Sequence, residues 1–242
     1  MASFAYPIRR DAGVARIDLG RPDEENSLTR AMMRDLAEAI RCEGAIADNR
    51  VVVIEGRGPF FCKGRDGRGE TTEGLKPHEV REQMMGAVLS VYAAIQSCPI
   101  PVASLIHAPA IGFGAALAGG CDITLASDAS KLAFSEVKHG IPPTLAMAAV
   151  MKKTPQKALA WLIYSGADVT PAEAVTMGLV SKVLPAASFA QDADGFLHEL
   201  ASRPRLVLET IKKYISHAQD MSVAQQSEAY GLGPMRAISV TV

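Results

Sequence analysis

The segment 109–144, PAIGFGAALAGGCDITLASDASKLAFSEVKHGIPPT, constrains the fold more than any other part of the sequence. The apolar run that leads into it from Pro101 predicts a buried strand. Gly112 and Gly114, on either side of Phe113, predict a tight turn into the helix AALAGG. A second apolar run, DITLAS, predicts another strand after that helix. The segment therefore indicates a strand, a glycine turn, a buried helix and a further strand.

The glycine turn and one acidic residue give this segment its chemical character. A helix that starts at such a turn has unpaired backbone N–H groups at its positively polarised end. That end can hold an anion or an oxygen on which negative charge develops. Downstream, Glu136 stands between Phe134 and Val137 in the apolar stretch LAFSEV. Burial there is expected to raise the pKa of Glu136 toward the range in which a carboxyl group exchanges protons at neutral pH.

The rest of the chain alternates short strands with helices. VARIDL, VVVIEG and LVSKVLP predict strands, and a helix with Ser27 or Thr29 as its N-cap follows the first of them. A long helix spans HEVREQMMGAVLSVYAAIQSC, and the chain is mostly helical beyond Thr144. This order predicts an α/β fold with a parallel sheet and a helical C-terminal portion. We expect a core from residues 1–185 and a helical, oligomer-forming region from residues 186–242.

Two loops precede the long helix. GRGPFFCKGRDGRGE combines glycines, aromatic residues and arginines, which predicts an exposed, functional loop. The polar segment 69–80 after it is expected to be a mobile flap. Arg65 and Arg68 in the first loop are either ordinary solvated charges or local partners for an anionic ligand.

Composition limits the class of protein. The chain has 242 residues, of which 48% are hydrophobic, enough for one sizeable core. With 25 basic and 26 acidic residues, its net charge of −1 offers no field that attracts nucleic acid or an anionic membrane. No apolar run approaches the roughly 20 residues of a membrane-spanning helix. The four cysteines show no C-x-x-C spacing and the start MASFAYPIRRDAG has no apolar signal core, so we expect a cytoplasmic protein without nucleic-acid or membrane partners.

Five motifs, in this order and spacing, resemble the enoyl-CoA hydratase/isomerase (crotonase) superfamily over nearly the whole chain. They are RPDEENSL, VVVIEGRGPFFCKGRD, HAPAIGFGAALAGGCDITLAS, FSEVKHGIPP and GADVTPAEAVTMGLVSKVLP. The resemblance implies a crotonase-like spiral of ββα units that acts on acyl-CoA thioesters. It also implies homotrimers or dimers of trimers, and no cofactor beyond the coenzyme A that carries the substrate. The Met- and Ala-rich helices 143–165 independently suggest an oligomer.

The resemblance further implies which residues form the site. Two backbone N–H groups, those of Arg65 and Phe113, would hold the thioester oxygen as negative charge develops on it. The implied substrate-binding residues lie in the first loop and in the glycine turn: Gly64, Arg65, Asp66, Gly67, Arg68, Gly112, Phe113 and Gly114.

The acidic residues depart from the pattern of typical hydratases. Those relatives carry two glutamates over the bound enoyl group, and the matching positions here are Ala116 and Glu136. Asp122 and Asp128 are alternatives if the register differs. An isomerase needs only one base to move a proton from C2 to C4, whereas a hydratase with one acid must use Glu136 both to activate water and to return the proton. The acidic turn 23–25 is a second departure, because many relatives have basic or small residues there.

Several functions remain open from the sequence. The first is proton transfer by Glu136, as hydratase or isomerase. A second is another crotonase-fold reaction, namely thioester hydrolysis, decarboxylation or dehalogenation. The third is a non-catalytic acyl-CoA-binding or protein-binding relative, in which Ala116 marks the loss of catalysis. His107 is expected to be a core histidine, and His139 is expected to be a loop residue close enough to Glu136 to influence its pKa.

Overall fold

The computed structural model describes residues 5–68, 71, 73–218, 221–222 and 225. The remaining residues of the expected flap, and the C-terminal end of the expected helical region from residue 226, lie outside the described residues.

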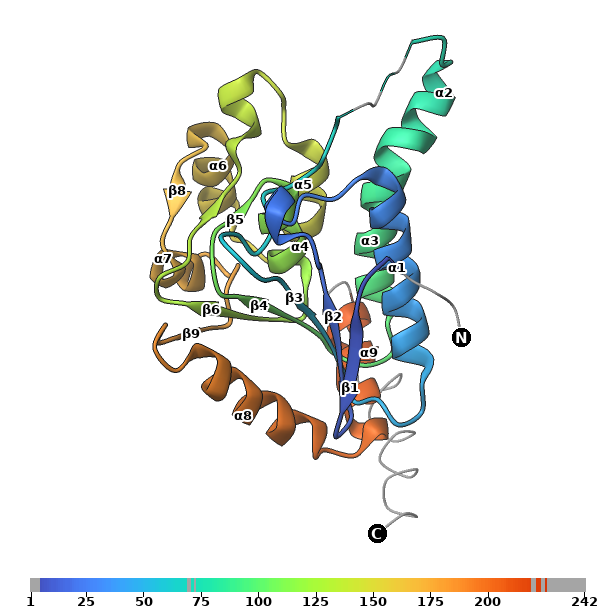
Figure 1. Ribbon diagram of the computed structural model, residues 1–242, viewed down its shortest axis with the longest axis vertical. Coiled ribbons are helices and arrows are strands. Elements are labelled where there is room, and N and C mark those ends of the chain that lie inside the picture. Colours follow the sequence, from blue (N-terminus) through green and yellow to red (C-terminus); the bar gives the residue numbers. More distant parts are fainter. Residues whose placement is uncertain (1–4, 69–70, 72, 219–220, 223–224, 226–242) are drawn as a thin grey trace.

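A six-stranded sheet forms the centre of the fold (Figure 1). Its strand order is β1-β2-β3-β4-β6-β9, and every neighbouring pair is parallel except β1 with β2. The strands are β1 (Ile8–Asp11), β2 (Val14–Asp18), β3 (Val51–Glu55), β4 (Val102–Ile106), β6 (Ile123–Ser127) and β9 (Lys182–Leu184). β3 and β4 consist almost entirely of buried apolar residues, as expected for strands covered on both faces.

A smaller sheet lies beside the first. It joins β5 (Ala110–Ile111), β7 (Leu132–Ala133) and β8 (Asp168–Val169), with β5 parallel to β7 and β7 antiparallel to β8. β5 leads directly into the glycine turn, and β7 leads to the segment that carries Glu136. The small sheet therefore brings the two chemical features of the sequence together.

Helices cover both faces of the large sheet. The α-helices are α1 (Arg30–Ala45), α2 (Pro77–Val80), α3 (Gly86–Ser97), α4 (Phe113–Gly120), α5 (Thr144–Val150), α6 (Gln156–Ser165), α7 (Pro171–Thr176), α8 (Phe189–Ala201) and α9 (Arg205–Ala218). The described residues also form two 3-10 helices, η1 (Pro22–Glu24) and η3 (Ser135–His139), and a π-helical turn, η2 (Arg81–Met85). α2, η2 and α3 form one continuous helical run, as predicted for the long helix.

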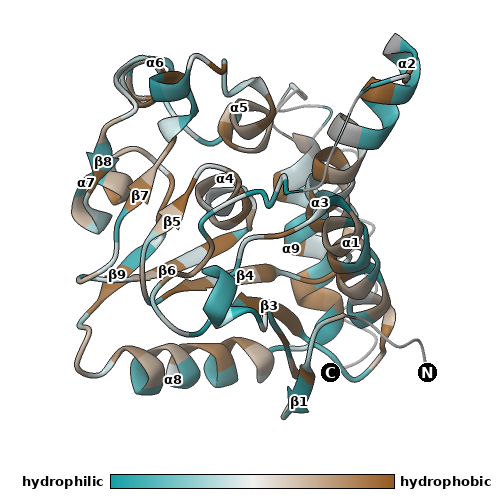
Figure 2. Cartoon of the chain, turned by 45° about the horizontal axis from the view of Figure 1, so that its top comes forward, coloured by the Kyte–Doolittle hydropathy of each residue, from teal (hydrophilic) through white to brown (hydrophobic). Residues whose placement is uncertain are grey.

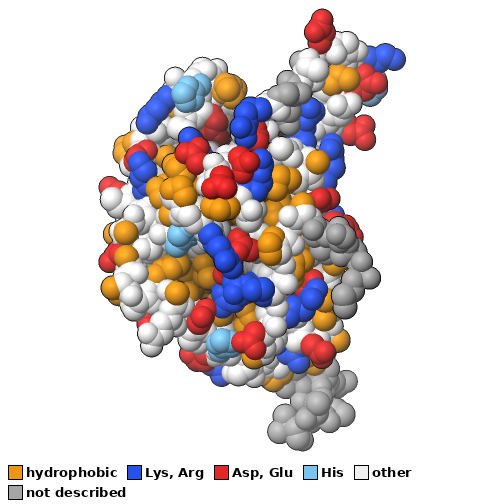
Figure 3. Space-filling view, in the orientation of Figure 1, with side chains coloured by type: hydrophobic (Ala, Val, Ile, Leu, Met, Phe, Trp, Pro, Cys, Tyr) orange, Lys and Arg blue, Asp and Glu red, His pale blue; other side chains and the backbone are white. Residues whose placement is uncertain are grey.

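The hydrophobic core has two parts, one on each face of the large sheet. The larger part packs the sheet against α1, α3 and α4, and the smaller part packs it against α8. Figure 2 shows the apolar strands between α8 on one side and α1, α3 and α4 on the other. In Figure 3, charged side chains of both signs are mixed over the visible face, in keeping with a net charge near zero.

Local sequence signals set several helix boundaries, and the N-cap predicted at Ser27 or Thr29 is confirmed at Thr29. The Thr29 hydroxyl accepts a hydrogen bond from the Met32 amide at 3.3 Å and caps α1. Thr170 and Glu173 form a complete capping box at the start of α7, and Gly166 ends α6 with φ +58°. These local signals were readable from sequence because they depend on residues only a few positions apart.

Two expectations need correction. The loop after β3 is not exposed throughout, because Phe61 and Cys62 are completely buried in the core. Phe61 and Cys62 therefore anchor in the core a loop that the sequence predicts to be exposed. His107 is not a core residue: it lies half-buried at the end of β4, and its Nε2 is 2.9 Å from the carbonyl oxygen of Gly58.

Candidate active site

The glycine turn is shaped by contacts that exclude any side chain. Gly112 has φ +55°, a region that residues with a Cβ rarely adopt. At Gly114, an added Cβ would collide with the carbonyl group of Cys62. Cys62 in turn accepts a hydrogen bond from the Ile111 amide at 2.9 Å. The loop after β3 and the start of α4 are therefore in direct main-chain contact.

This contact places two peptide groups side by side. A Cβ at Gly64 would lie 3.1 Å from the Ile111 carbonyl oxygen and 3.7 Å from the Phe113 nitrogen. The peptide that joins Gly64 to Arg65 thus runs along the first residues of α4. Gly64 has φ +123°, so both its conformation and its neighbours favour glycine.

The amides of Arg65 and Phe113 make no hydrogen bond to any described residue. Phe113 is the first residue of α4, so its N–H points out of the helix end. At Arg65 the orientation follows from its neighbours: the Gly64 carbonyl accepts from the Leu28 amide, and the Asp66 amide donates to the Leu28 carbonyl. In an extended chain the N–H between them points the opposite way. Both unpaired donors lie next to the Gly64–Phe113 contact.

The far end of α4 is firmly held. The carbonyl oxygen of Ala118 accepts hydrogen bonds from the hydroxyls of Ser104 at 3.1 Å and Thr124 at 2.7 Å. The carbonyl oxygen of Gly120 accepts one from Lys153 Nζ at 2.7 Å. A cation at the C-terminal end of a helix also suits the helix dipole. α4 is therefore a rigid, buried support for the donor at its N-terminal end.

Glu136 lies next to the glycine turn, on η3. Its Oε1 would be 3.0 Å from a Cβ at Gly112, one residue before the Phe113 amide. Its Oε2 is buried without a hydrogen-bond partner among the described residues. Burial raises the pKa of Glu136, and its own backbone amide and the charge of His139 lower it to a smaller extent. The Glu136 carboxyl group therefore lies close to the start of α4 and is partly shielded from water.

The other acidic candidates are engaged elsewhere. Asp122 Oδ2 accepts from the Val102 amide at 2.8 Å and pairs with Lys212 at 2.7 Å. Asp128 Oδ1 accepts from the Ala186 amide at 2.9 Å. Ala116, at the position of the expected first glutamate, is completely buried one turn into α4. Of these positions, only Glu136 brings a carboxylate to the glycine turn.

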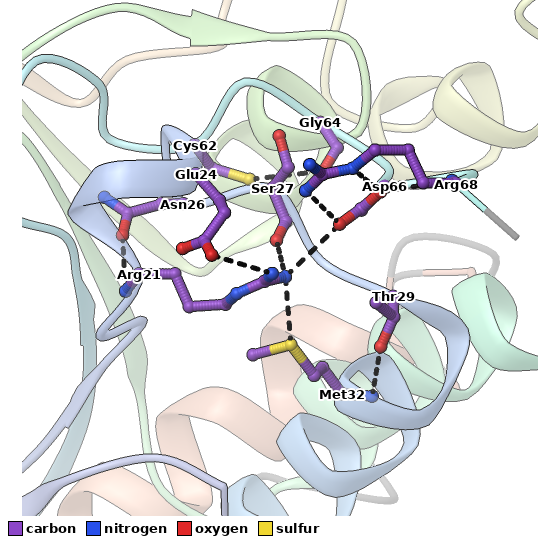
Figure 4. Close-up of polar contacts among 10 residues, drawn as sticks. All are labelled: Arg21, Glu24, Asn26, Ser27, Thr29, Met32, Cys62, Gly64, Asp66 and Arg68. Carbon is purple, nitrogen blue, oxygen red and sulfur yellow. Dashed lines mark hydrogen bonds and ion pairs between the residues drawn. The ribbon is translucent and has the colours of Figure 1, made fainter.

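A cluster of polar contacts holds the Arg65 loop in place (Figure 4). Asp66 is buried and pairs with Arg68 at 2.8 Å and with Arg21 at 3.5 Å. The hydrogen bonds from Arg68 hold the pKa of Asp66 well below its ordinary value. The guanidinium of Arg68 is thus occupied by Asp66, whereas Arg65 is exposed and makes no side-chain contact of this kind with a described residue. Gly67 is open, with no atom within 4 Å of an added Cβ.

The N-terminal turn, residues 21–27, braces the same loop. The completely buried Asn26 side chain accepts a hydrogen bond from the Arg21 amide and donates to the carbonyls of Arg57 and Phe60, at 2.8–2.9 Å. The acidic turn is partly neutralised, because Glu25 pairs with Lys63. This turn is therefore a structural support for the loop that carries Arg65.

Tyr92 lies at the candidate site, and the sequence did not indicate this. It lies on α3, and its ring stacks on that of Phe113 with centroids 6.1 Å apart and an angle of 24° between the planes. Its hydroxyl is buried without a partner among the described residues. In the sequence, Tyr92 is one aromatic residue in a long amphipathic helix, and nothing nearby in the chain shows what its hydroxyl faces.

A cavity of about 500 Å³ opens beyond Tyr92. Its walls come from α3, the end of α4, α5, α9 and the segment after α7, and they include Ile95, Ala149, Leu179 and Ile211. The cavity does not include Glu136 or the glycine turn, so it adjoins the candidate site and is separate from it.

The described part of the chain shows no arrangement typical of a metal site or of a membrane-spanning helix. It contains no group of three or more His, Cys, Asp or Glu side chains arranged to hold a metal ion. Its helices are too short or too polar to cross a membrane.

Comparisons with solved structures identify the fold. The crystal structure of an enoyl-CoA hydratase from Mycobacterium smegmatis superposes with a TM-score of 0.87 at 24% identity, over 96% of this chain and 90% of that one. A putative enoyl-CoA hydratase from Streptomyces coelicolor A3(2) gives 0.87 at 25% identity, over 97% and 86%. The sheets, the glycine turn and the helical C-terminal region thus define a crotonase-type fold, and the expected fold class is confirmed.

The sequence comparisons identify the family. A family profile described as enoyl-CoA hydratase/isomerase matches residues 9–231. Enoyl-CoA hydratase domain-containing protein 3, mitochondrial, from Rattus norvegicus is 28% identical over 218 residues, which are 89% of this chain and 72% of the rat protein. A putative enoyl-CoA hydratase from Thermus thermophilus is 26% identical over 204 residues, covering 84% and 80%. The chain belongs to the enoyl-CoA hydratase/isomerase family.

Proposed function

We propose that this protein is an enzyme that binds an acyl-CoA thioester and moves protons on its acyl group with Glu136. The thioester oxygen accepts hydrogen bonds from the amides of Arg65 and Phe113. The family acts on acyl-CoA substrates, and the relatives named above carry the name enoyl-CoA hydratase. The observation that carries the proposal is local: two unpaired backbone donors lie beside a partly buried carboxyl group, one oxygen of which has no partner among the described residues.

The chemistry follows from these groups. Proton removal next to a thioester, or addition of water to its enoyl form, places negative charge on the thioester oxygen. Fixed donors stabilise that charge, and loss of one such donor typically costs about 3 kcal/mol of barrier. Glu136 with a raised pKa can both accept and return a proton near neutral pH. Either hydration of a 2-enoyl thioester or migration of a 3-enoyl double bond is possible with these parts.

The test is the variant Glu136→Gln, which keeps the shape of the side chain and removes its basicity. We expect kcat on the best enoyl-CoA substrate to fall about 100- to 10,000-fold. The Kd of the CoA thioester should change little, because the amides are untouched. Glu199→Gln, on the surface of α8, is the matched control and should behave like the wild type.

The products of the wild-type reaction separate the alternatives. A screen of 2- and 3-enoyl-CoA esters reports hydration and double-bond migration, and release of free CoA or of carbon dioxide would indicate another crotonase-type reaction. Thioester binding without turnover would indicate a non-catalytic relative. Unchanged turnover in Glu136→Gln would refute the role of Glu136.

The proposal includes a homotrimer or dimer of trimers. Large apolar side chains are exposed on and near α5 and α6: Ile141, Met151, Trp161 and Tyr164. Such a group of residues suits a contact with another copy of the chain. Sedimentation that shows only monomer would overturn this part.

A further inference from the structure

The Tyr92 hydroxyl and Glu136 Oε2 are both buried and both lack a hydrogen-bond partner among the described residues. An unpaired buried polar atom is costly, and buried tyrosine hydroxyls usually find a partner. Phenylalanine at position 92 would keep the ring stacked on Phe113 without this cost. The hydroxyl therefore requires an explanation beyond packing.

The two unpaired groups approach the start of α4 from different elements. Tyr92 comes from α3 and covers the ring of Phe113, whose amide is one of the two proposed donors to the thioester oxygen. Glu136 comes from η3 and lies against Gly112, the preceding residue. A thioester held at the Phe113 amide would place the first carbons of its acyl group between these two side chains.

The protonation states of the two groups are complementary. Burial raises the pKa of the Tyr92 hydroxyl far above its ordinary value, and the charge of Glu136 raises it further. The hydroxyl therefore stays a neutral donor at all working pH values. Glu136, when ionised, is an acceptor.

Ala116 explains why such a donor is needed. It follows Phe113 by three residues, so both lie on neighbouring positions of one face of α4. The resemblance to two-glutamate hydratases places an acid at this position, and the methyl group of Ala116 can neither donate nor accept a hydrogen bond. Tyr92 offers a polar group from the neighbouring helix instead.

We propose that the Tyr92 hydroxyl binds the oxygen atom at C3 of the acyl group and shares that oxygen with Glu136. The oxygen is that of the water about to add, and afterwards that of the 3-hydroxyl group. This inference rests on the proposed function and deepens it: it selects a 2-enoyl thioester as substrate and its 3-hydroxyacyl thioester as product.

The hydration step balances without any further reactant. Glu136 takes one proton from water while the water oxygen forms a bond to C3. The electron pair of the C2–C3 double bond moves toward the thioester oxygen, where the amides of Arg65 and Phe113 stabilise the enolate. Protonated Glu136 then gives its proton to C2. Tyr92 keeps its own proton and only orients the oxygen.

The test measures binding and does not depend on turnover. Wild type and Tyr92→Phe are titrated calorimetrically with 3-hydroxybutyryl-CoA and with butyryl-CoA, which lacks the C3 oxygen. The hydrogen bond from Tyr92 should strengthen wild-type binding of the 3-hydroxy ester about fivefold, and Tyr92→Phe should lower the preference for that ester by the same factor. Tyr214→Phe makes the same chemical change on α9, at a residue that is 39% exposed and lies outside the candidate site, and it should keep the preference.

The outcomes distinguish this inference from the function on which it rests. If the wild type binds both esters equally, or if Tyr92→Phe keeps the preference, the role of Tyr92 is refuted while acyl-CoA binding stands. If neither ester binds to the wild type, the proposed function fails and this inference fails with it. As a second readout, Tyr92→Phe should lower kcat for hydration of crotonyl-CoA about tenfold or more and leave double-bond migration nearly unchanged.

Discussion

Lys212 should be among the most important single side chains for the stability of the fold. It lies on α9 and is only 5% exposed. Its Nζ donates to the carbonyl oxygens of Ile95 at 2.8 Å and Ile100 at 3.0 Å, and it pairs with Asp122 Oδ2 at 2.7 Å. One ammonium group thus ties the last described helix to the end of α3 and to the starts of β4 and β6.

The variant Lys212→Met keeps most of the apolar stem and removes the charge. Asp122 then retains only the hydrogen bond from the Val102 amide, and two carbonyl groups lose their donor. Breaking a buried ion pair by removing one partner typically costs roughly 3–5 kcal/mol. The Asp122 side chain is 29% exposed, so water relieves part of this cost. We therefore expect a loss of about 3 kcal/mol in the free energy of unfolding.

The loss in the free energy of unfolding is measured from denaturant unfolding curves monitored by circular dichroism. For a chain of this size the melting temperature should fall by roughly 6–12 °C. Lys157→Met, the same change at an exposed residue of α6, is the control and should stay within about 0.5 kcal/mol of the wild type. The double variant Lys212→Met with Asp122→Asn should recover part of the loss, because the uncompensated charge is gone. A Lys212→Met protein as stable as the Lys157→Met protein would refute the reasoning.

Further predictions concern the site. His139→Gln removes a positive charge that lowers the pKa of Glu136. The acidic limb of the kcat/KM pH profile should therefore move to higher pH. A limb that stays in place or moves to lower pH contradicts this. Asn26→Ala leaves the Arg21 amide and two carbonyls without partners, and it should lower the free energy of unfolding by about 2–4 kcal/mol, as measured by denaturant unfolding. Gly114→Ala forces a Cβ into the Cys62 carbonyl and should prevent accumulation of folded protein, which a normal yield with native circular dichroism would disprove.

The features that sequence predicts well are local or periodic. The strands β2, β3, β4 and β6 are short runs of apolar residues, and the caps at Thr29 and Thr170 depend on neighbours within one helical turn. The glycine turn is equally visible, because Gly112 and Gly114 mark a backbone path that other residues cannot follow. The partial burial of Glu136 also follows from its apolar neighbours.

The features that sequence misses depend on long-range contacts. Phe61 and Cys62 belong to the core because β5 and α4 pack onto them, which no pattern inside their own loop shows. Tyr92 and Phe113 are 21 positions apart and meet only through the packing of α3 on α4. The pairing of Lys212 with Asp122 spans 90 positions. A single sequence contains no direct information about which distant residues come into contact.

The main-chain contact between Gly114 and Cys62 has a consequence for how this scaffold can change. Both proposed thioester donors are peptide groups, and the spacing between their two segments is set by atoms that every amino acid shares. Substitutions at Arg65 can alter what surrounds the ligand without changing the width of the opening that receives it. Side chains around the proposed ligand can therefore change to fit new substrates, while the two proposed backbone donors to the carbonyl oxygen stay in place.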